Sequence, residues 1–337
     1  MNYIGIDLHK RIIVICALND KREVIARKRF NNDQVEEMKD FFERQKPFQA
    51  VFEATAAYDW FYELLDPLAE RVLLAHPKHL RIIAESTKKS DKVDAYILAT
   101  FLHLGMIPEA HCPSPYIKGY RTLMRTRNKI QGRITSAKNR IRNVLAKYNQ
   151  DRQNVFTQKG RAWLKQFKLR DADRFKIGLL MDELDFFEGQ LKKIEAEIRA
   201  YAKKAPQRIA EARTLLRTIP GVGEITADVV VSELGDINRF SSEKKVCSYA
   251  GLDPGRRQSA EKETNLPITK EGSKFLRWVL VEAAWCSVQY SQKWKRIYQS
   301  MLKRTRNTKK AIVAVARKLL CVMVSLLRNG RAYSVSA

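Results

Sequence analysis

The chain has 337 residues, of which 45% are hydrophobic, so it can form two folded domains and is too apolar for a wholly disordered protein. Lysine and arginine number 63 against 37 acidic residues, which gives a net charge of +26. A folded chain this basic usually binds a polyanion, and nucleic acid is the first candidate. An anionic membrane surface fits poorly, because the basic residues are spread over several segments rather than gathered on one amphipathic helix.

Neither the cysteines nor the apolar runs indicate an exported or membrane protein. The five cysteines lie far apart and form no C-x-x-C pair, so neither a disulfide framework nor a zinc site is expected. The sequence opens on a strand-like run rather than on a signal-peptide pattern. The longest apolar run, 311–327, is interrupted by Arg317 and Lys318, so no transmembrane segment is predicted. We expect a cytoplasmic protein that makes no membrane contact.

Residues 3–29 contain three strand-like runs, YIGIDL, IIVICAL and EVIARKRF, separated by short polar breaks. Two hairpins in succession predict an antiparallel meander. A polar amphipathic helix follows over 32–45, then a strand over 48–53, a helix over 59–70 and a strand over 71–75. This order predicts a mixed α/β sheet with helices, of the ribonuclease H-like type.

Four acids in this half of the chain are candidate metal ligands. Asp7 is the lone charge in the strand YIGIDL, and Glu53 ends the strand FQAVFE. If 90–104 is helical, Asp91 and Asp94 share one helix face. Four converging carboxylates suit two Mg²⁺ ions, with Mn²⁺ as a substitute, and such ions promote phosphoryl transfer. Taken singly, each acid is more simply a solvated surface group.

The segment KKSDKVDA has two further interpretations. Ser90 can cap a solvated helix whose dipole favours Asp91. Alternatively Lys88 and Lys89 contact a nucleic-acid backbone beside the metal ligands.

A long basic helix is predicted over 116–150, with no acid before Asp151. A face of this kind repels itself unless phosphates lie on it, so backbone binding is favoured over a merely solvated face. The candidate contacts are Arg121, Arg125, Arg127, Arg133 and Arg140.

Apolar residues over 177–198 recur in steps of three and four, an a/d seam flanked by charges of both signs. The seam can pack within the chain as a helical hairpin. The strictness of the pattern favours a coiled coil that joins two protomers.

The C-terminal third begins after Ala205-Pro206. Residues 215–234 have the pattern helix, Pro-Gly-Val-Gly, helix, in which the Gly221 and Gly223 amides can hold a phosphate; an ordinary tight turn is equally consistent. A loop then presents Arg256, Arg257 and Ser259, where arginines can clamp a phosphate and serine can be a nucleophile or a donor. A helix resumes near Ser273, and 285–331 is helical and basic. Lys270 and Arg277 are further candidate nucleic-acid contacts.

Six motifs together resemble the DEDD transposases of bridge-RNA-guided insertion sequences, a family that combines a RuvC-like domain with a serine-containing transposase domain. They are YIGIDLHK, VFEATAAY, KKSDKVDA, TIPGVGEITA, YAGLDP and ITKEGSKFLR, and they are spread over nearly the whole chain. The resemblance implies a RuvC-like DEDD domain with a basic helical extension over 1–150. It further implies a coiled-coil dimerisation segment over 151–205 and a mostly helical, serine-containing transposase domain over 206–337.

The resemblance also implies a mechanism and a set of partners. Asp7, Glu53, Asp91 and Asp94 would bind Mg²⁺, and Ser259 would attack the DNA phosphodiester to give a covalent phosphoserine intermediate before strand exchange. The partners would be double-stranded donor and target DNA, a structured noncoding guide RNA, and further copies of the chain in a dimer or tetramer. A nuclease or junction resolvase that uses the four acids alone, and a non-catalytic architectural nucleic-acid-binding protein, are the alternatives.

Overall fold

A computed structural model of the chain describes residues 1–55, 58–83, 91–259 and 262–334, with only the backbone of residues 81–83, Lys92, 256–259 and 262–265. The chain divides into two compact units, Met1–Cys112 and Pro113–Ala337. No helix in the described part is both long and apolar enough to cross a membrane.

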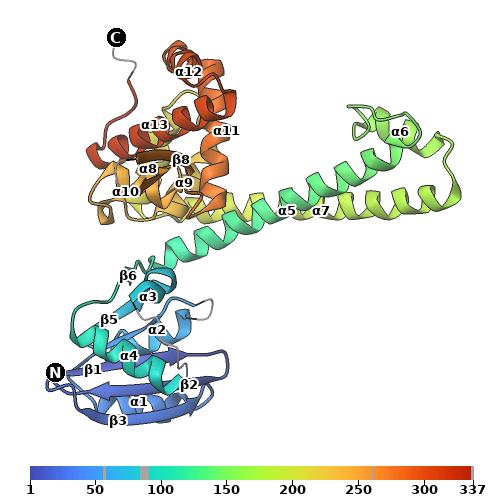
Figure 1. Ribbon diagram of the computed structural model, residues 1–337. Helices are drawn as coiled ribbons and strands as arrows, with labels where there is room; N and C mark the ends of the chain where they lie inside the picture. Colours follow the sequence, from blue (N-terminus) through green and yellow to red (C-terminus); the bar gives the residue numbers. More distant parts are fainter. Residues whose placement is uncertain (56–57, 84–90, 260–261, 335–337) are drawn as a thin grey trace. The chain divides into compact units, whose positions relative to one another are not determined.

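The first unit is built on a six-stranded sheet in the order β3-β2-β1-β4-β5-β6. Strands β1 to β3 form the predicted antiparallel meander, and β4 and β5 continue the sheet parallel to β1 (Figure 1). The mixed α/β sheet is therefore confirmed. The strands are β1 (Asn2–Leu8), β2 (Ile12–Leu18), β3 (Val24–Asn31), β4 (Phe48–Glu53), β5 (Arg71–Ala75) and β6 (Glu109–Ala110).

Alternation along the strands gives each face of the sheet its own apolar layer. Ile4, Ile6 and Ile13 pack with the first pair of helices, α1 (Val35–Glu43) and α2 (Asp59–Leu65). The intervening residues of the strands face α4 (Asp91–His103), which lies on β1 and β2; α3 (Pro77–Ile83) precedes it in the chain. Helix α2 ends at Leu65, earlier than predicted; Asp66 still has helical φ and ψ, but Pro67 follows and has no N–H to continue the hydrogen bonds of the helix.

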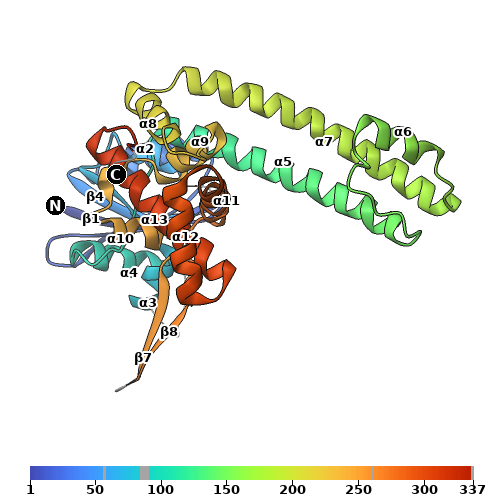
Figure 2. The same cartoon turned by 90° about the horizontal axis from the view of Figure 1, so that it is seen from above.

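The second unit begins with a helical hairpin. Helices α5 (Pro115–Ala146) and α7 (Asp171–Lys203) lie antiparallel along each other, and α6 (Gln158–Gln166) covers the end of the hairpin where the chain turns back (Figures 1 and 2). The seam of α7 is buried against α5 of the same chain: Ile177, Leu180 and Leu184 form one apolar cluster with Ile134 and Ile141. The seam thus supplies the intrachain packing that was the first of the two alternatives.

The rest of the second unit is mostly helical, as predicted. Its apolar core also takes in Tyr120 and Met124 from the beginning of α5, which ties the hairpin to the helices that follow. These helices are α8 (Gln207–Arg217), α9 (Glu224–Leu234), a 3-10 turn at Ile237–Arg239, α10 (Glu243–Tyr249), α11 (Lys274–Tyr290), α12 (Gln292–Thr305) and α13 (Thr308–Asn329).

The segment around Ser259 was predicted to be a loop, and that prediction is wrong. Residues Pro254–Ser259 and Lys262–Ile268 form a two-stranded antiparallel hairpin, β7-β8, that extends away from the helices of its unit (Figure 2). Pairing the two segments satisfies backbone groups that a loop would leave to water. Pro254 is the first residue of β7, and Pro267 is the last but one of β8. Both lie at the end of the hairpin farthest from its turn, where a missing N–H is tolerated.

Candidate metal centre

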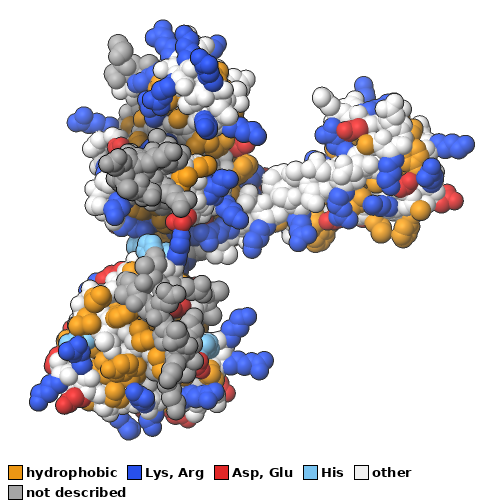
Figure 3. All heavy atoms as spheres, viewed as in Figure 1, with side chains coloured by type: hydrophobic (Ala, Val, Ile, Leu, Met, Phe, Trp, Pro, Cys, Tyr) orange, Lys and Arg blue, Asp and Glu red, His pale blue; other side chains and the backbone are white. Residues whose placement is uncertain are grey.

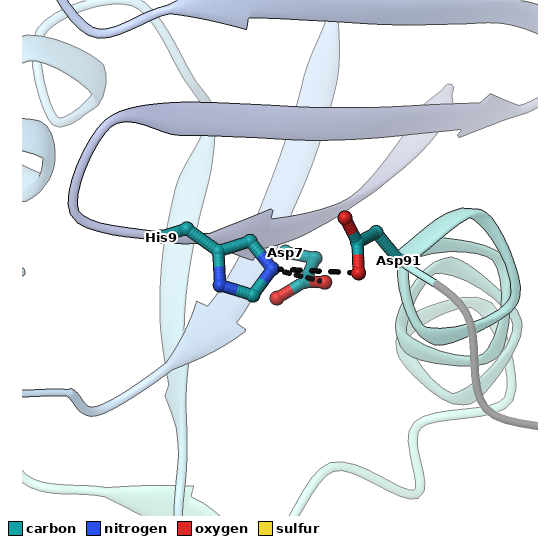
Figure 4. Close-up of side chains that lie close together, drawn as sticks. All are labelled: Asp7, His9 and Asp91. Carbon is teal, nitrogen blue, oxygen red and sulfur yellow. Dashed lines mark hydrogen bonds and ion pairs between the residues drawn. The ribbon is translucent and has the colours of Figure 1, made fainter.

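Two of the four predicted acids meet beside a histidine in the first unit. Asp7 lies near the end of β1, His9 follows two residues later, and Asp91 begins α4 (Figure 4). His9 Nε2 lies 3.0 Å from Asp7 Oδ2 and 3.6 Å from Asp91 Oδ1. One ligand atom from each of the three residues lies within 4.8 Å of the others. This spacing lets all three contact a single cation.

A close backbone contact positions the two acids. A Cβ atom at Gly5 would lie only 2.1 Å from the Ala95 carbonyl oxygen and 2.3 Å from the Ala99 amide nitrogen. Gly5 therefore lets α4 rest directly on β1, and Ala95 and Ala99 keep the helix side of the contact small. Asp91 is one helical turn before Ala95, so the contact brings it to the level of Asp7 on the strand.

The electrostatics of Asp7 are those of a carboxylate among other acids. Burial raises the pKa of Asp7, the nearby charge and hydrogen bond of His9 oppose this rise, and Asp91 and Asp94 add to it. The Asp7 side chain is 20% exposed. Partial burial next to like charges disfavours the charged form, and a bound cation would remove that disadvantage.

The sheet also places Glu53 on the strand next to that of Asp7. Strands β1 and β4 are parallel, and Ile6 pairs with Phe52 at the end of their ladder, so Asp7 and Glu53 are the next residues on neighbouring strands. Gly5 and Val51 pair two residues earlier, and Val51 packs in the cluster that contains Leu98 of α4. By alternation, Glu53 belongs to the face of the sheet that α4 covers, as Asp7 does.

The donor chemistry fits a divalent cation. Carboxylate oxygens are the preferred ligands of Mg²⁺ and Mn²⁺, and a neutral imidazole nitrogen is an acceptable ligand for Mn²⁺ and later transition metals. His9 was not among the predicted site residues. Its signal in the sequence was its position two residues after Asp7, which in an extended chain places both side chains on one face.

Other predicted site residues lie elsewhere. Ser259 belongs to β7 in the second unit, where it pairs with Lys262 and where Arg256 and Arg257 share its strand; for these residues the backbone alone is described. The side chains of Lys88 and Lys89 fall outside the described residues, as does the proposed cap Ser90.

The premise that no acid neutralises the α5 arginines is wrong. Acids from α7 and α9 reach them across the unit: Arg125 binds the carboxylate of buried Glu233, Arg127 binds Glu195, and Arg140 binds Glu183. Arg121 instead donates to the main-chain carbonyls of residues 232 and 233. Arg133 forms no ion pair within the described part of the chain. Their binding to nucleic acid stays a prediction.

The glycine turn between α8 and α9 has a packing role. Gly221 has a φ of +87°, and a Cβ there would lie 2.4 Å from the Ser287 amide nitrogen of α11. Ser287 also donates a hydrogen bond to the Pro220 carbonyl at 2.7 Å. Gly223 precedes the first residue of α9 and has open space around it. The tight-turn interpretation thus explains Gly221, and phosphate binding at the turn stays a prediction.

Lys270 and Arg277 lie on either side of the start of α11. Arg277 donates a hydrogen bond to the Ala250 carbonyl at 3.0 Å, and burial lowers its pKa. This contact holds the segment that leads into β7. Lys270 is exposed, with a φ of +56°.

Comparison with known proteins places these features in a family. Residues 4–150 match the DEDD domain described as "Transposase", and residues 213–299 match the "Transposase IS116/IS110/IS902 family". The first match contains Asp7, Glu53, Asp91 and Asp94, and the DEDD domain suggests a divalent metal.

Relatives agree over almost the full length. The chain is 23% identical over 350 residues to a "Probable family 20 transposase" of Pseudomonas aeruginosa, with 99% of this chain and 98% of the relative covered. It is also 23% identical over 346 residues to the "Transposase for insertion sequence element IS1111A" of Coxiella burnetii, with 99% and 92% covered. A "Pilin gene-inverting protein" of Moraxella bovis is 32% identical over 124 residues, which are 36% of this chain and 38% of that one. The chain belongs to the IS116/IS110/IS902 family of insertion-sequence transposases, enzymes that cleave and transfer DNA strands.

Proposed function

We propose that this transposase is an RNA-guided recombinase. Its reaction would use two sets of residues: the metal-binding acids of the first unit and Ser259 of the second. The observation that carries the proposal is the convergence of Asp7 and Asp91, from a strand and a helix far apart in the sequence, on one point of a basic chain. The strand order of the first unit, Met1–Cys112, supports a ribonuclease H-like, RuvC-like sheet; the basic helical extension proposed for the rest of 1–150 corresponds to α5 of the second unit.

In the proposed site Asp7, Glu53, Asp91 and Asp94 hold Mg²⁺ or Mn²⁺, with His9 beside Asp7. The cation would neutralise charge on the reacting phosphate and lower the pKa of the attacking hydroxyl. Ser259 Oγ attacks phosphorus, so an Oγ–P bond forms and one backbone P–O bond breaks. The serine proton leaves, and the departing DNA oxygen gains a proton. Because a phosphodiester replaces a phosphodiester, the reverse step can rejoin a different strand end without an external energy source.

The guide RNA and the DNA partners of the proposal rest on the family resemblance and on the net charge of +26. Base pairing to a guide would specify the donor and target sequences, while the protein would bind the backbones of the duplexes. If this is right, changing only the pairing segment of the guide will move the insertion site. A fixed insertion site would contradict RNA guidance.

A homodimer is part of the proposal, and the outer face of α7 supports it. Phe175, Leu179 and Phe186 are 71%, 56% and 61% exposed, and they follow one another at helical spacings of four and seven. Hydrophobic side chains are visible on the surface of the hairpin in Figure 3. Since the inner seam of α7 is filled by α5, this outer stripe is the part of the helix open to a second copy, and two dimers could form a tetramer.

The test uses a nicked DNA substrate that traps covalent protein–DNA intermediates. The wild-type chain should give a slowly migrating band on a denaturing gel in Mg²⁺, and the band should be lost in Ser259→Ala while DNA binding persists. The matched variant Ser291→Ala removes a hydroxyl in the same unit and should keep the band. Cleavage that survives Ser259→Ala without a covalent band would instead support a nuclease that uses the four proposed acids alone, all of which lie in the first unit.

A further inference from the structure

A cavity of about 490 Å³ opens beside the metal centre of the first unit. Its lining includes Asp91 of α4, Val14 and Cys16 of β2, and Arg27, Lys28 and Arg29 of β3. One cavity is therefore lined both by a carboxylate that could bind a cation and by two guanidinium groups.

The register of the sheet sets this arrangement. Asp7 pairs with Val14, and Val14 pairs with Arg29, so the three residues form one row across three strands. Arg27 occupies the row of Gly5 and Cys16, two residues along. Residues paired across strands share a face, so both arginines belong to the face on which α4 lies.

The environment of Cys16 also indicates that the Arg27 side chain lies on the α4 face of the sheet. Burial raises the pKa of the Cys16 thiol, and the guanidinium of Arg27 acts in the opposite sense through its charge and a hydrogen bond. That opposition requires the guanidinium to lie near the thiol, on the α4 face of the sheet.

The charge of the two arginines is available to a ligand. Both are exposed, β3 is the edge strand of the sheet, and neither arginine forms an ion pair with an acid in the described part of the first unit. The arginines of α5 differ, because most of them are neutralised by acids of their own unit. Guanidinium groups without an acidic partner on a strand edge favour an oxyanion that accepts two hydrogen bonds, such as the two non-bridging oxygens of a phosphodiester.

We propose that Arg27 and Arg29 bind the DNA backbone at phosphates next to the one that reacts at the metal centre. The two intervening strand spacings put Arg29 about 10 Å from Asp7. Because neighbouring phosphates are separated by at least the axial rise of 3.4 Å per nucleotide, that distance spans at most about three nucleotides along one strand. The arginines thus act as positioning residues that align the substrate strand across β1, β2 and β3. This assignment deepens the proposed function and depends on it for the identity of the reacting phosphate.

The test measures DNA binding by the full-length chain in EDTA, so that no metal chemistry is needed. Each lost phosphate contact should lower the slope of log affinity against log salt by roughly one, so the double variant Arg27→Gln/Arg29→Gln should lose about two. Arg44→Gln is the matched control, because Arg44 caps α1 on the opposite side of the sheet and should leave the slope unchanged. Circular dichroism melting checks that all variants are folded.

A second measurement locates the contact. Neutral methylphosphonate linkages placed about one to three nucleotides from the cleavage position should weaken binding by the wild-type chain and have no further effect on the double variant. A double variant that matches Arg44→Gln in slope and affinity would overturn the proposal. A loss seen with an RNA duplex but not with DNA would overturn the assignment to the substrate strand.

These outcomes are separate from those that test the proposed function. If the wild-type chain never forms a covalent intermediate but the arginine variants still lose phosphate contacts, the recombinase mechanism fails and the binding site stands. If the covalent band forms and the salt slope does not change, the mechanism stands and this site fails.

Discussion

At the scale of single residues, Gly5 sets how closely α4, which carries Asp91, approaches β1, which carries Asp7. The sequence offered no sign of this role, because the partners Ala95 and Ala99 are some 90 residues away and only the packed structure brings them to the strand. Local spacing could indicate that Asp91 and Asp94 share a helix face, but it could not indicate how closely that helix approaches Asp7.

Gly5→Ala should therefore disrupt both the fold and the site. The added methyl group must displace α4, which we expect to cost about 1–3 kcal/mol in the free energy of unfolding. It should also weaken metal binding, because Asp91 moves with the helix. Urea unfolding, and the shift in melting temperature on adding Mn²⁺, measure the two effects.

Gly132→Ala is the matched control. A Cβ at Gly132 meets nothing within 4 Å, and the residue lies inside α5. Alanine there should leave metal binding unchanged and stabilise the helix by up to about 1 kcal/mol. Equal behaviour of the two variants would contradict the role of Gly5.

Asp7→Asn should separate catalysis from stability. Because metal ions supply several kcal/mol of transition-state stabilisation, we expect strand cleavage to fall by at least about a hundredfold. In EDTA the same variant should melt at a higher temperature than the wild type at pH values above the raised pKa of Asp7. The sign follows from the raised pKa: the folded chain holds the Asp7 proton more tightly than the unfolded chain, so ionisation destabilises the fold as pH rises.

The pH series provides the check. The advantage of Asp7→Asn should be largest at high pH, should shrink as pH falls through the raised folded-state pKa, and should be absent below the unfolded value. A melting temperature that is lower for Asp7→Asn at every pH would contradict the electrostatic description of the site.

At the scale of elements, α5 shows the limit of charge counting along a sequence. The arginines of this helix lack acidic neighbours nearby in the chain, but Glu183, Glu195 and Glu233 reach them from α7 and α9. These pairs join residues 43 to 108 positions apart. The helix itself and the apolar seam of α7 were predictable from periodicity, whereas their ion pairs were not. The β7-β8 hairpin was missed because its strands contain few β-branched residues and no aromatic ones, while its glycine and prolines are typical of a loop.

Two matched variants distinguish structural arginines from binding ones. Arg125→Gln leaves the fully buried Glu233 carboxylate without its ion pair, which should lower the free energy of unfolding by about 1–3 kcal/mol. Arg133→Gln should leave stability unchanged and reduce the salt slope of DNA binding by roughly one. Chemical denaturation and salt titration compare the two, and the reverse pattern would refute this division of roles.

At the scale of the whole molecule, the outer stripe of α7 should determine assembly. Each fully buried phenylalanine contributes about 1.5–3 kcal/mol, so Phe175→Ser/Phe186→Ser should weaken a dimer at least about a hundredfold in Kd. Tyr290→Ser, which changes another side chain that is 71% exposed, should leave the dimer intact. Analytical ultracentrifugation over a concentration series measures both. A wild-type chain that stays monomeric throughout would rule out this stripe as an interface.

The junction of β1 with α4 has a consequence for motion as well as for catalysis. Asp7 belongs to a strand that is hydrogen-bonded on both sides, whereas Asp91 belongs to the first turn of a helix. Without a cation, the mutual repulsion of their carboxylates acts to open that first turn, and with a cation the ligands tie the turn to the sheet. Amide hydrogen exchange at the beginning of α4 should therefore slow on adding Mn²⁺, while exchange in the centre of β1 stays unchanged. Binding of the cation would then suppress local unfolding of the first turn of α4, and its release would restore it. The helix would be most ordered when the enzyme is ready to react.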